Sequence, residues 1–107
     1  MKNIKTFENF NNQDIFDYIR TGDIESIKNY IDSGYDLNIW DNRGYTVLTK
    51  AAYYDNIEIV KLLLDAGVDI NKENDNGNAL IWATTKSNID IIKVLLIAGY
   101  KIQNSIN

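Results

Sequence analysis

The chain contains no cysteine, no histidine and no proline. Without cysteine and histidine it cannot build a disulfide framework or a Cys/His zinc site, and it has no thiol nucleophile, imidazole base or Ser-His-Asp triad. The lack of proline excludes proline-rich linkers and collagen-like segments. What is present suits a folded protein: 107 residues, 45% apolar and 24% charged, are enough for one domain with a hydrophobic core.

Basic residues and long apolar runs are also scarce. Fifteen acidic and 11 basic residues give a net charge of −4, whereas proteins that neutralise nucleic-acid phosphates usually carry a basic surplus. No apolar run reaches the ~18 residues of a membrane span, and no apolar stretch follows the charged residues 1–5 as in a secretory signal. We therefore expect neither a nucleic acid nor a membrane as partner. The expected location is cytoplasmic, in the host if the chain is of viral or phage origin.

An internal repeat runs through the chain. Similar short strings begin at Gly34, Gly67 and Gly99, which lie 33 and 32 residues apart. Each string follows a matching apolar segment: residues 23–31, 56–64 and 88–96. These segments are predicted helices, because their apolar residues recur at helical spacing and each starts with an Asp or Asn that can cap the first turn. The glycines stand where a left-handed residue would end each helix.

A shorter helix is predicted before each of these segments. The three shorter helices cover residues 13–20, 48–54 and 80–86. Thr46 and Asn78 are the expected N-caps of the second and third. Residues 41–45 and 74–78 are rich in Asn, Asp and Gly, which is typical of tight hairpin turns. One unit is thus a turn followed by two antiparallel helices.

This unit resembles the ankyrin repeat. The match is best over residues 41–73, where Gly44-Tyr45-Thr46-Val47-Leu48 stands in place of the family's Gly-x-Thr-Pro-Leu, and it covers residues ~14–103. The resemblance implies an all-α solenoid of about three repeats, in which antiparallel helix pairs are joined by β-turn or hairpin fingers. We divide the chain into four parts: an N-terminal capping segment (1–13), a first, capping repeat (14–40), a second repeat (41–73), and a third repeat with a C-terminal cap (74–107).

Two further expectations concern the bonds between repeats and the N-terminal end of the array. The family's Thr-Pro-Leu-His histidine is replaced by Thr49 and Ile81, so the hydrogen bonds that it makes between repeats must be absent or substituted. Ile4, Phe7 and Phe10 recur every three residues, and we expect them to pack over the first repeat, although a frayed tail is the alternative.

The resemblance also implies where a partner would bind, because family members usually grip partners with the finger tips and the exposed face of the inner helices. The corresponding residues here are Arg20, Trp40, Asn42, Arg43, Tyr45, Tyr53, Tyr54, Glu73, Asp75, Thr85 and Lys86. Most of these residues that belong to the second repeat are aromatic or arginine, which are the residue types enriched at binding hot spots. In the alternative interpretation, Tyr53 and Tyr54 shield the groove between repeats and Trp40 packs on its own hairpin. Trp82 is expected to fill a gap between repeats.

Catalysis, metal binding and cofactor binding are not expected. The loop carboxylates fall at repeat-equivalent positions, where fixing a turn is a sufficient role, and there is no glycine-rich phosphate loop. The string Asp69-x-Asn71-x-Glu73 resembles the start of an EF-hand. It lacks the required glycine and the terminal glutamate, since Asn74 and Leu80 occupy those positions.

The predicted function is therefore a non-catalytic one. We expect a stand-alone binder, adaptor or inhibitor that contacts an unknown partner protein through its concave face. The alternative is a structural or assembly protein that self-associates through an apolar C-terminal edge, formed by Ile97, Ile102 and Ile106. A monomer is expected in the first case and a homodimer through the C-terminal face in the second.

Overall fold

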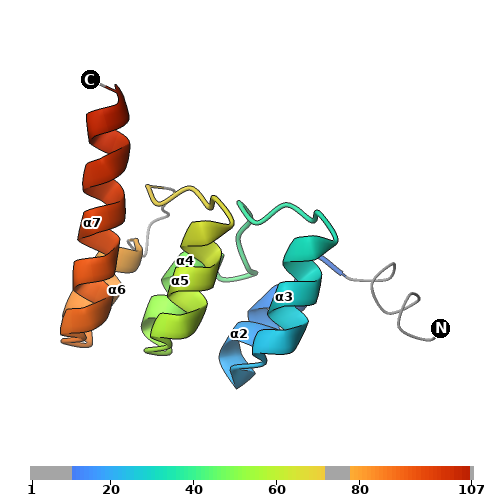
Figure 1. Ribbon diagram of the computed structural model, residues 1–107. Coiled ribbons are helices and arrows are strands. Elements are labelled where there is room, and N and C mark those ends of the chain that lie inside the picture. The colour runs from blue at the N-terminus through green and yellow to red at the C-terminus, as the bar shows by residue number, and fades with distance from the viewer. Residues whose placement is uncertain (1–10, 72–77, 107) are drawn as a thin grey trace.

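The computed structural model of the chain describes residues 11–71 and 78–106, with side chains as far as residue 99. The described residues form six helices: α2 (Asp14–Thr21), α3 (Ile24–Asp32), α4 (Val47–Tyr53), α5 (Ile57–Asp65), α6 (Ala79–Thr85) and α7 (Ile89–Ile106). Figure 1 shows three antiparallel pairs side by side, with α2 and α3 at one end of the row and α6 and α7 at the other. Helix α4 packs against both α2 and α6, so the short helices form one continuous inner layer. The predicted all-α repeat fold is confirmed.

The helix starts follow the predicted capping pattern. Each expected cap accepts a hydrogen bond at 3.0–3.1 Å from the backbone amide three residues further on: Asp23, Thr46, Asn56, Asn78 and Asn88. These bonds satisfy amides that the helix itself leaves unpaired. The helices therefore begin within a residue or two of the predicted positions.

The helix ends agree with prediction in two of three cases. Gly34 and Gly67 adopt φ angles of 82° and 88° just after α3 and α5, as a left-handed C′ residue should. The third prediction is wrong, because Gly99 lies inside α7, which continues to Ile106. As a result α7 has 18 residues, whereas α5 has nine. Figure 1 shows α7 extending past the turns that join the other pairs.

The loops that follow the first two glycines explain this difference. In each loop an Asp side chain accepts a hydrogen bond from the amide two residues on: Asp36 from Asn38 at 2.9 Å, and Asp69 from Asn71 at 3.0 Å. The Asn38 side chain in turn accepts from the Asp69 amide at 2.8 Å and ties the two loops together. The third string has Lys101 where the others have Asp, and an ammonium group cannot accept the bond that fixes the turn.

The core lies between the two helix layers and runs through all three pairs. It is built from isoleucine, leucine and alanine side chains that are almost fully buried, among them Ile15, Ile19, Ile27, Ala51, Ile59, Leu63, Ala83, Ile91 and Leu95. Thr49, at the family's histidine position, is also buried, and its hydroxyl accepts a 2.8 Å hydrogen bond from the Thr46 hydroxyl. This pair lies within the second repeat, so it does not reproduce the hydrogen bonds between repeats that the family's histidine makes.

Tyr30 closes the core of the first pair. Its ring is fully buried and stacks on Tyr35 with 5.0 Å between ring centroids, and its hydroxyl donates to the Asn12 carbonyl at 3.3 Å. Burial, with a smaller contribution from the charge of Asp14, raises the pKa of Tyr30 to about 12. Tyr30 and Tyr35 are therefore packing residues of the first pair. The expected packing of Ile4, Phe7 and Phe10 over the first repeat lies outside the described residues.

Candidate protein-binding surface

A furrow of about 550 Å³ opens on the inner face between the first and second helix pairs. Its lining comes from α2, the first finger and α4: Gln13, Phe16, Asp17, Arg20, Trp40, Asp41, Asn42, Lys50 and Tyr54. The α2 residues recur at helical spacing, so they form one stripe along the furrow. The furrow brings together four of the predicted binding residues, namely Arg20, Trp40, Asn42 and Tyr54.

The first finger is a tight turn organised by one carboxylate. The Asp41 amide donates to the Tyr45 carbonyl at 2.9 Å, and Gly44 takes a φ of 86° that a side chain would disfavour. Oδ1 of Asp41 accepts two backbone hydrogen bonds, from Arg43 and from Tyr45, both at 2.9 Å. The Gln13 side chain donates to the Trp40 carbonyl at 3.1 Å and anchors the finger to the start of α2. The predicted turn at residues 41–45 is confirmed.

Lys50 lies at the junction of the finger and α4. Its Nζ is 3.4 Å from Oδ2 of Asp41, with the two side chains only 19% and 8% exposed. It also lies 5.0, 6.0 and 5.7 Å from the ring centroids of Tyr45, Tyr53 and Tyr54, which is within cation–π range. Lys50 therefore orients three of the predicted aromatic residues. The sequence reasoning missed it, although its spacing of four residues from both Thr46 and Tyr54 already placed it on their face of the helix.

Aromatic rings continue across the inner face to the third pair. The Tyr53 ring contacts Tyr54 and Trp82 edge to face, with centroid distances of 5.0 and 5.2 Å, and Tyr45 reaches Trp82 at 6.0 Å. Nζ of Lys86 lies 4.5 Å from the Tyr53 centroid. Trp82 therefore bridges the second and third pairs, as expected. Its indole N–H is buried and has no hydrogen-bond partner among the described residues.

The contacts and the exposure of the aromatic residues bear on both interpretations. Tyr53 and Tyr54 pack against their neighbours as the shielding interpretation requires, yet 38% and 37% of their surfaces stay exposed. Trp40 is 45% exposed, so packing on its own hairpin does not bury it. Rings that are held in place yet open to solvent are what a binding surface needs.

The remaining predicted residues are less central to this surface. Arg43 is exposed on the finger but does not line the furrow. Thr85 is exposed, and its hydroxyl donates to the Ile81 carbonyl one turn earlier at 2.9 Å. Glu73 and Asp75 lie outside the described residues.

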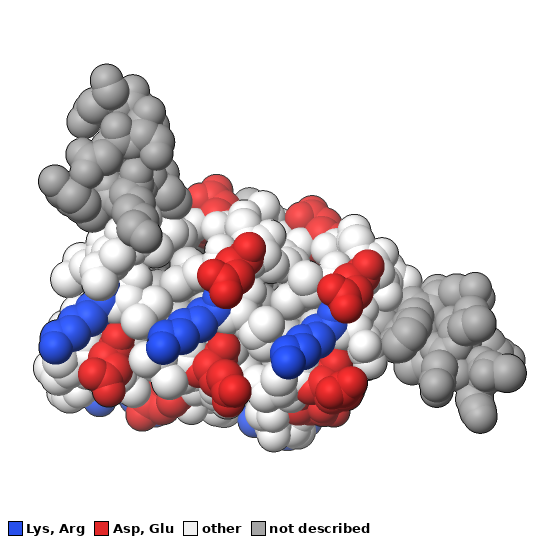
Figure 2. Space-filling model, in the orientation of Figure 1, with Lys and Arg blue, Asp and Glu red and all other residues white. Residues whose placement is uncertain are grey.

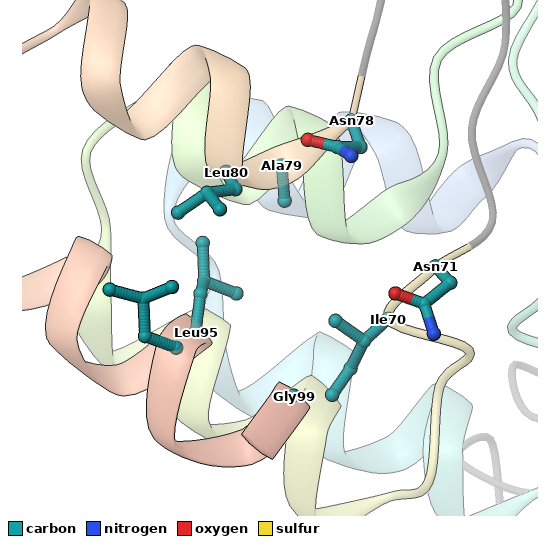
Figure 3. A pocket seen from close by; sticks show the side chains of 8 residues that line it. Ile70, Asn71, Asn78, Ala79, Leu80, Leu95 and Gly99 are labelled. Atoms are coloured by element: carbon teal, nitrogen blue, oxygen red, sulfur yellow. The ribbon is translucent and has the colours of Figure 1, made fainter. Parts of the chain in front are cut away.

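A second apolar surface lies at the α6–α7 end of the row. Three large aliphatic residues there are exposed: Ile81, Ile89 and Leu96. Leu96 also lines a cavity of about 290 Å³ between the start of α6 and the middle of α7, together with Leu80, Leu95 and Gly99 among others (Figure 3). Of the predicted edge residues, Ile97 is exposed but lines a groove between α5 and α7 with Lys61 and Leu64. The side chains of Ile102 and Ile106 lie outside the described set.

Neither a membrane span nor a metal cluster is found in the part of the chain that the structure describes. None of its helices is long and apolar enough to cross a bilayer. Within the same residues, no three acidic side chains lie close enough together to hold a metal ion.

Comparison with known proteins extends over most of the chain. Residues 15–106 match the family profile of ankyrin repeats, in three copies. The chain is 42% identical over 52 residues to the ankyrin repeat protein YahD of Escherichia coli (strain K12), which is 49% of this chain and 26% of YahD. It is 38% identical over 71 residues to the ankyrin repeat protein FPV034 of Fowlpox virus (strain NVSL), which is 66% of this chain and 17% of that protein. The chain thus spans about a quarter or less of these relatives.

A solved structure shares the fold. One chain of the complex between the predatory endopeptidase Bd0816 from Bdellovibrio bacteriovorus and the immunity protein Bd3460 superposes with a TM-score of 0.72 at 34% identity. The match covers 79% of this chain and 45% of that chain. The repeat architecture derived from the helix pairs is therefore the one seen in a known complex.

Proposed function

Because the chain belongs to the ankyrin repeat family, whose repeats generally mediate protein–protein interaction, we propose that it binds a partner protein, without catalysis, through its concave inner face. One observation carries the proposal. Trp40, Tyr53 and Tyr54 are large aromatic residues that stay more than a third exposed on the inner face, although each belongs to a hydrogen-bonded turn or helix end. Such side chains bury much area on binding and lose little rotamer entropy.

The ring contacts favour a preorganised surface. Lys50 fixes the orientation of three tyrosines, and Trp82 supports Tyr45 and Tyr53 from the next pair. A partner would therefore meet side chains that need little further ordering, which lowers the entropic cost of association. The likeness to a chain from an endopeptidase–immunity protein complex supports a role as a binder or adaptor whose effect can be inhibition of its partner.

The test is capture of partners with three matched baits. The first is the wild-type chain, and the second carries Trp40→Ala, Tyr53→Ala and Tyr54→Ala. The third removes three exposed residues of the α6–α7 end instead, by Ile81→Ala, Ile89→Ala and Leu96→Ala. Circular dichroism checks that all three baits are folded. A protein retained by the first and third baits but not the second supports binding through the concave face, whereas equal retention by all three contradicts it.

Self-association through the α6–α7 end is the second candidate function. The observation that favours it is a change in exposure between equivalent positions: Thr49 on α4 is 1% exposed, whereas Ile81, its counterpart on α6, is 52% exposed. The end of the row thus presents an aliphatic face where the middle repeat is covered by its neighbour. Sedimentation at high micromolar concentration tests this function, because a monomeric mass there contradicts it and a dimer that Leu96→Lys dissociates supports it.

A further inference from the structure

Resting on the proposed concave-face binding, we infer that the furrow between α2 and α4 receives a short extended segment of the partner in which an apolar side chain stands next to an Asp or Glu carboxylate. The apolar side chain lies over Phe16 between Trp40 and Tyr54, and the carboxylate pairs with Arg20. Shape, wall chemistry and charge each support this assignment.

The dimensions of the furrow suit an extended strand of a few residues. The α2 stripe runs from Gln13 to Arg20, which is about 10 Å along a helix axis. Three residues of an extended peptide cover about the same length. The volume of about 550 Å³ holds such a segment with its side chains, whereas a whole helix, about 10 Å in diameter, would lie across the rim.

The walls of the furrow are apolar in the middle and polar at the ends. Phe16 forms a buried floor, and the exposed rings of Trp40 and Tyr54 come from the finger and from α4. An aliphatic or aromatic side chain placed there would be removed from water on three sides. The exposed amide of Asn42 at the finger end can donate to and accept from a peptide backbone.

The charges of the furrow favour a partner carboxylate over a partner cation. Asp41 already has three partners, since Oδ1 accepts two backbone amides and Oδ2 faces Lys50. Lys50 is likewise enclosed by Asp41 and the tyrosine rings. Among the residues that the structure describes, Arg20 pairs with Asp17 alone, at 3.5 Å in a pair that is mostly exposed. An exposed pair of this kind is weak, so Arg20 can turn its planar group to a bidentate carboxylate contact.

The outer face and the furrow differ in how their charges are arranged. Figure 2 shows the outer helices α3, α5 and α7, where basic and acidic side chains lie side by side. The described residues that line the furrow carry two cations, Arg20 and Lys50, and two acids, Asp17 and Asp41. These charges balance, and Lys50 and Asp41 are paired with each other. The attraction for an acidic segment therefore comes from Arg20, whose pair with Asp17 is mostly exposed.

The test uses random linear peptides displayed on phage and selected on the wild-type chain. The inference expects selected sequences in which an apolar residue neighbours Asp or Glu. One selected peptide is then synthesised together with a version in which Asn or Gln replaces each acid. Binding is followed in a Trp82→Phe background, which leaves Trp40, on the furrow wall, as the single tryptophan reporter.

Charge reversal locates the carboxylate contact. Arg20→Glu should weaken binding of the acidic peptide about tenfold or more, because it replaces attraction by repulsion, and Arg20→Gln should have a smaller effect. The matched control is Lys28→Glu, which makes the same charge change in the same helix pair on exposed α3 and should leave binding unchanged. Removing the acids from the peptide should weaken its binding to the Trp82→Phe chain similarly, a result that does not depend on how any Arg20 variant folds.

The possible failures are distinguishable. Selected peptides without acidic enrichment, binding that Arg20→Glu leaves intact, or no selected peptides at all would each overturn the inference. The proposed function survives those results if a captured partner still depends on Trp40, Tyr53 and Tyr54 together. It fails in its own test, in which the partner is retained by the variant that lacks these three rings.

Discussion

Replacing Asp41 by alanine should destabilise the chain by about 3–4 kcal/mol, because one carboxylate makes three contacts at the base of the first finger. Its Oδ1 accepts the amides of Arg43 and Tyr45 at 2.9 Å, and its Oδ2 lies 3.4 Å from the Lys50 ammonium. The two amide bonds contribute about 2–3 kcal/mol together, at about 1–1.5 kcal/mol each. The ion pair is partly shielded from water and adds about 1 kcal/mol. For a small domain whose total stability is about 5–15 kcal/mol, this loss is large.

Asp41→Asn separates the two contributions. The amide oxygen of asparagine can still accept the two backbone bonds, while the negative charge opposite Lys50 disappears. The expected loss is then about 1 kcal/mol, provided by the ion pair alone. Combining Asp41→Asn with Lys50→Met completes a double-mutant cycle, and its coupling energy should also be about 1 kcal/mol.

The assay is urea unfolding of each variant, followed by circular dichroism. Asp65→Ala serves as the control, because this exposed acid on α5 should change stability by less than about 0.5 kcal/mol. If Asp41→Ala cost no more than Asp41→Asn, the two amide bonds would not hold the finger and the reasoning would be refuted. The same variants also bear on function, since a finger loosened by Asp41→Ala no longer presents Trp40 and Asn42 in fixed positions.

Four further predictions follow from the packing and the backbone conformation. Tyr30 has a pKa of about 12 in the fold against an ordinary 10, so the stability that this difference represents is fully present below pH 10 and is lost as the pH rises toward 12; Tyr30→Phe should flatten that part of a stability–pH profile. Leu63→Ala should cost about 3 kcal/mol in urea unfolding because Leu63 is fully buried, and a loss below about 1 kcal/mol would contradict the packing. Gly99→Ala should stabilise the chain by about 0.5–1 kcal/mol, because α7 continues through a glycine that has open space at its Cβ position. Gly67→Ala should instead destabilise the chain by about 1 kcal/mol, because the φ angle of Gly67 is 88°. If the two substitutions had equal effects, Gly67 and Gly99 would have the same backbone conformation, which would contradict the structure.

Most of the fold could be predicted from the sequence because the repeat supplies the same local signals several times. Asp or Asn at the first position of each outer helix, and Thr46 or Asn78 before the inner ones, specify where helices start through bonds that reach only three residues. Such short-range bonds depend little on distant parts of the chain. The ends at Gly34 and Gly67 are predicted from a different signal, a glycine that can adopt a left-handed φ.

The continuation of α7 through Gly99 could not be predicted from the glycine alone. A glycine permits a left-handed turn but does not enforce one, because it also fits within a helix at a cost of about 1 kcal/mol. What enforces the turn after Gly67 is the Asp69 side chain and the bond from its amide to Asn38 of the preceding loop. The third string has neither a carboxylate at that position nor a later loop among the described residues to pair with.

The candidate site could be predicted from the sequence less completely than the helices. Repeat alignment placed Arg20, Trp40, Asn42 and Tyr54 on one face, and all four line the furrow. It gave no sign that Asp41 and Lys50 meet, because that contact joins a turn to a helix nine residues later and depends on how the finger folds back. Contacts of this kind are set by tertiary geometry, which a one-dimensional repeat does not encode.

Apart from Ile97, which lines the groove between α5 and α7, the exposed large apolar side chains of the described residues fall into two groups that differ physically. Trp40, Tyr53 and Tyr54 lie on the inner face, where ring contacts and hydrogen bonds of the finger limit their freedom. Ile81 and its aliphatic neighbours lie at positions that the next pair covers in the middle of the row. The first group is a surface whose shape is fixed before a partner arrives, which favours specific recognition. The second is a repeat interface without its neighbour in this structure, which favours association with another helix pair, so variants at the two faces should have independent effects on partner capture and on mass.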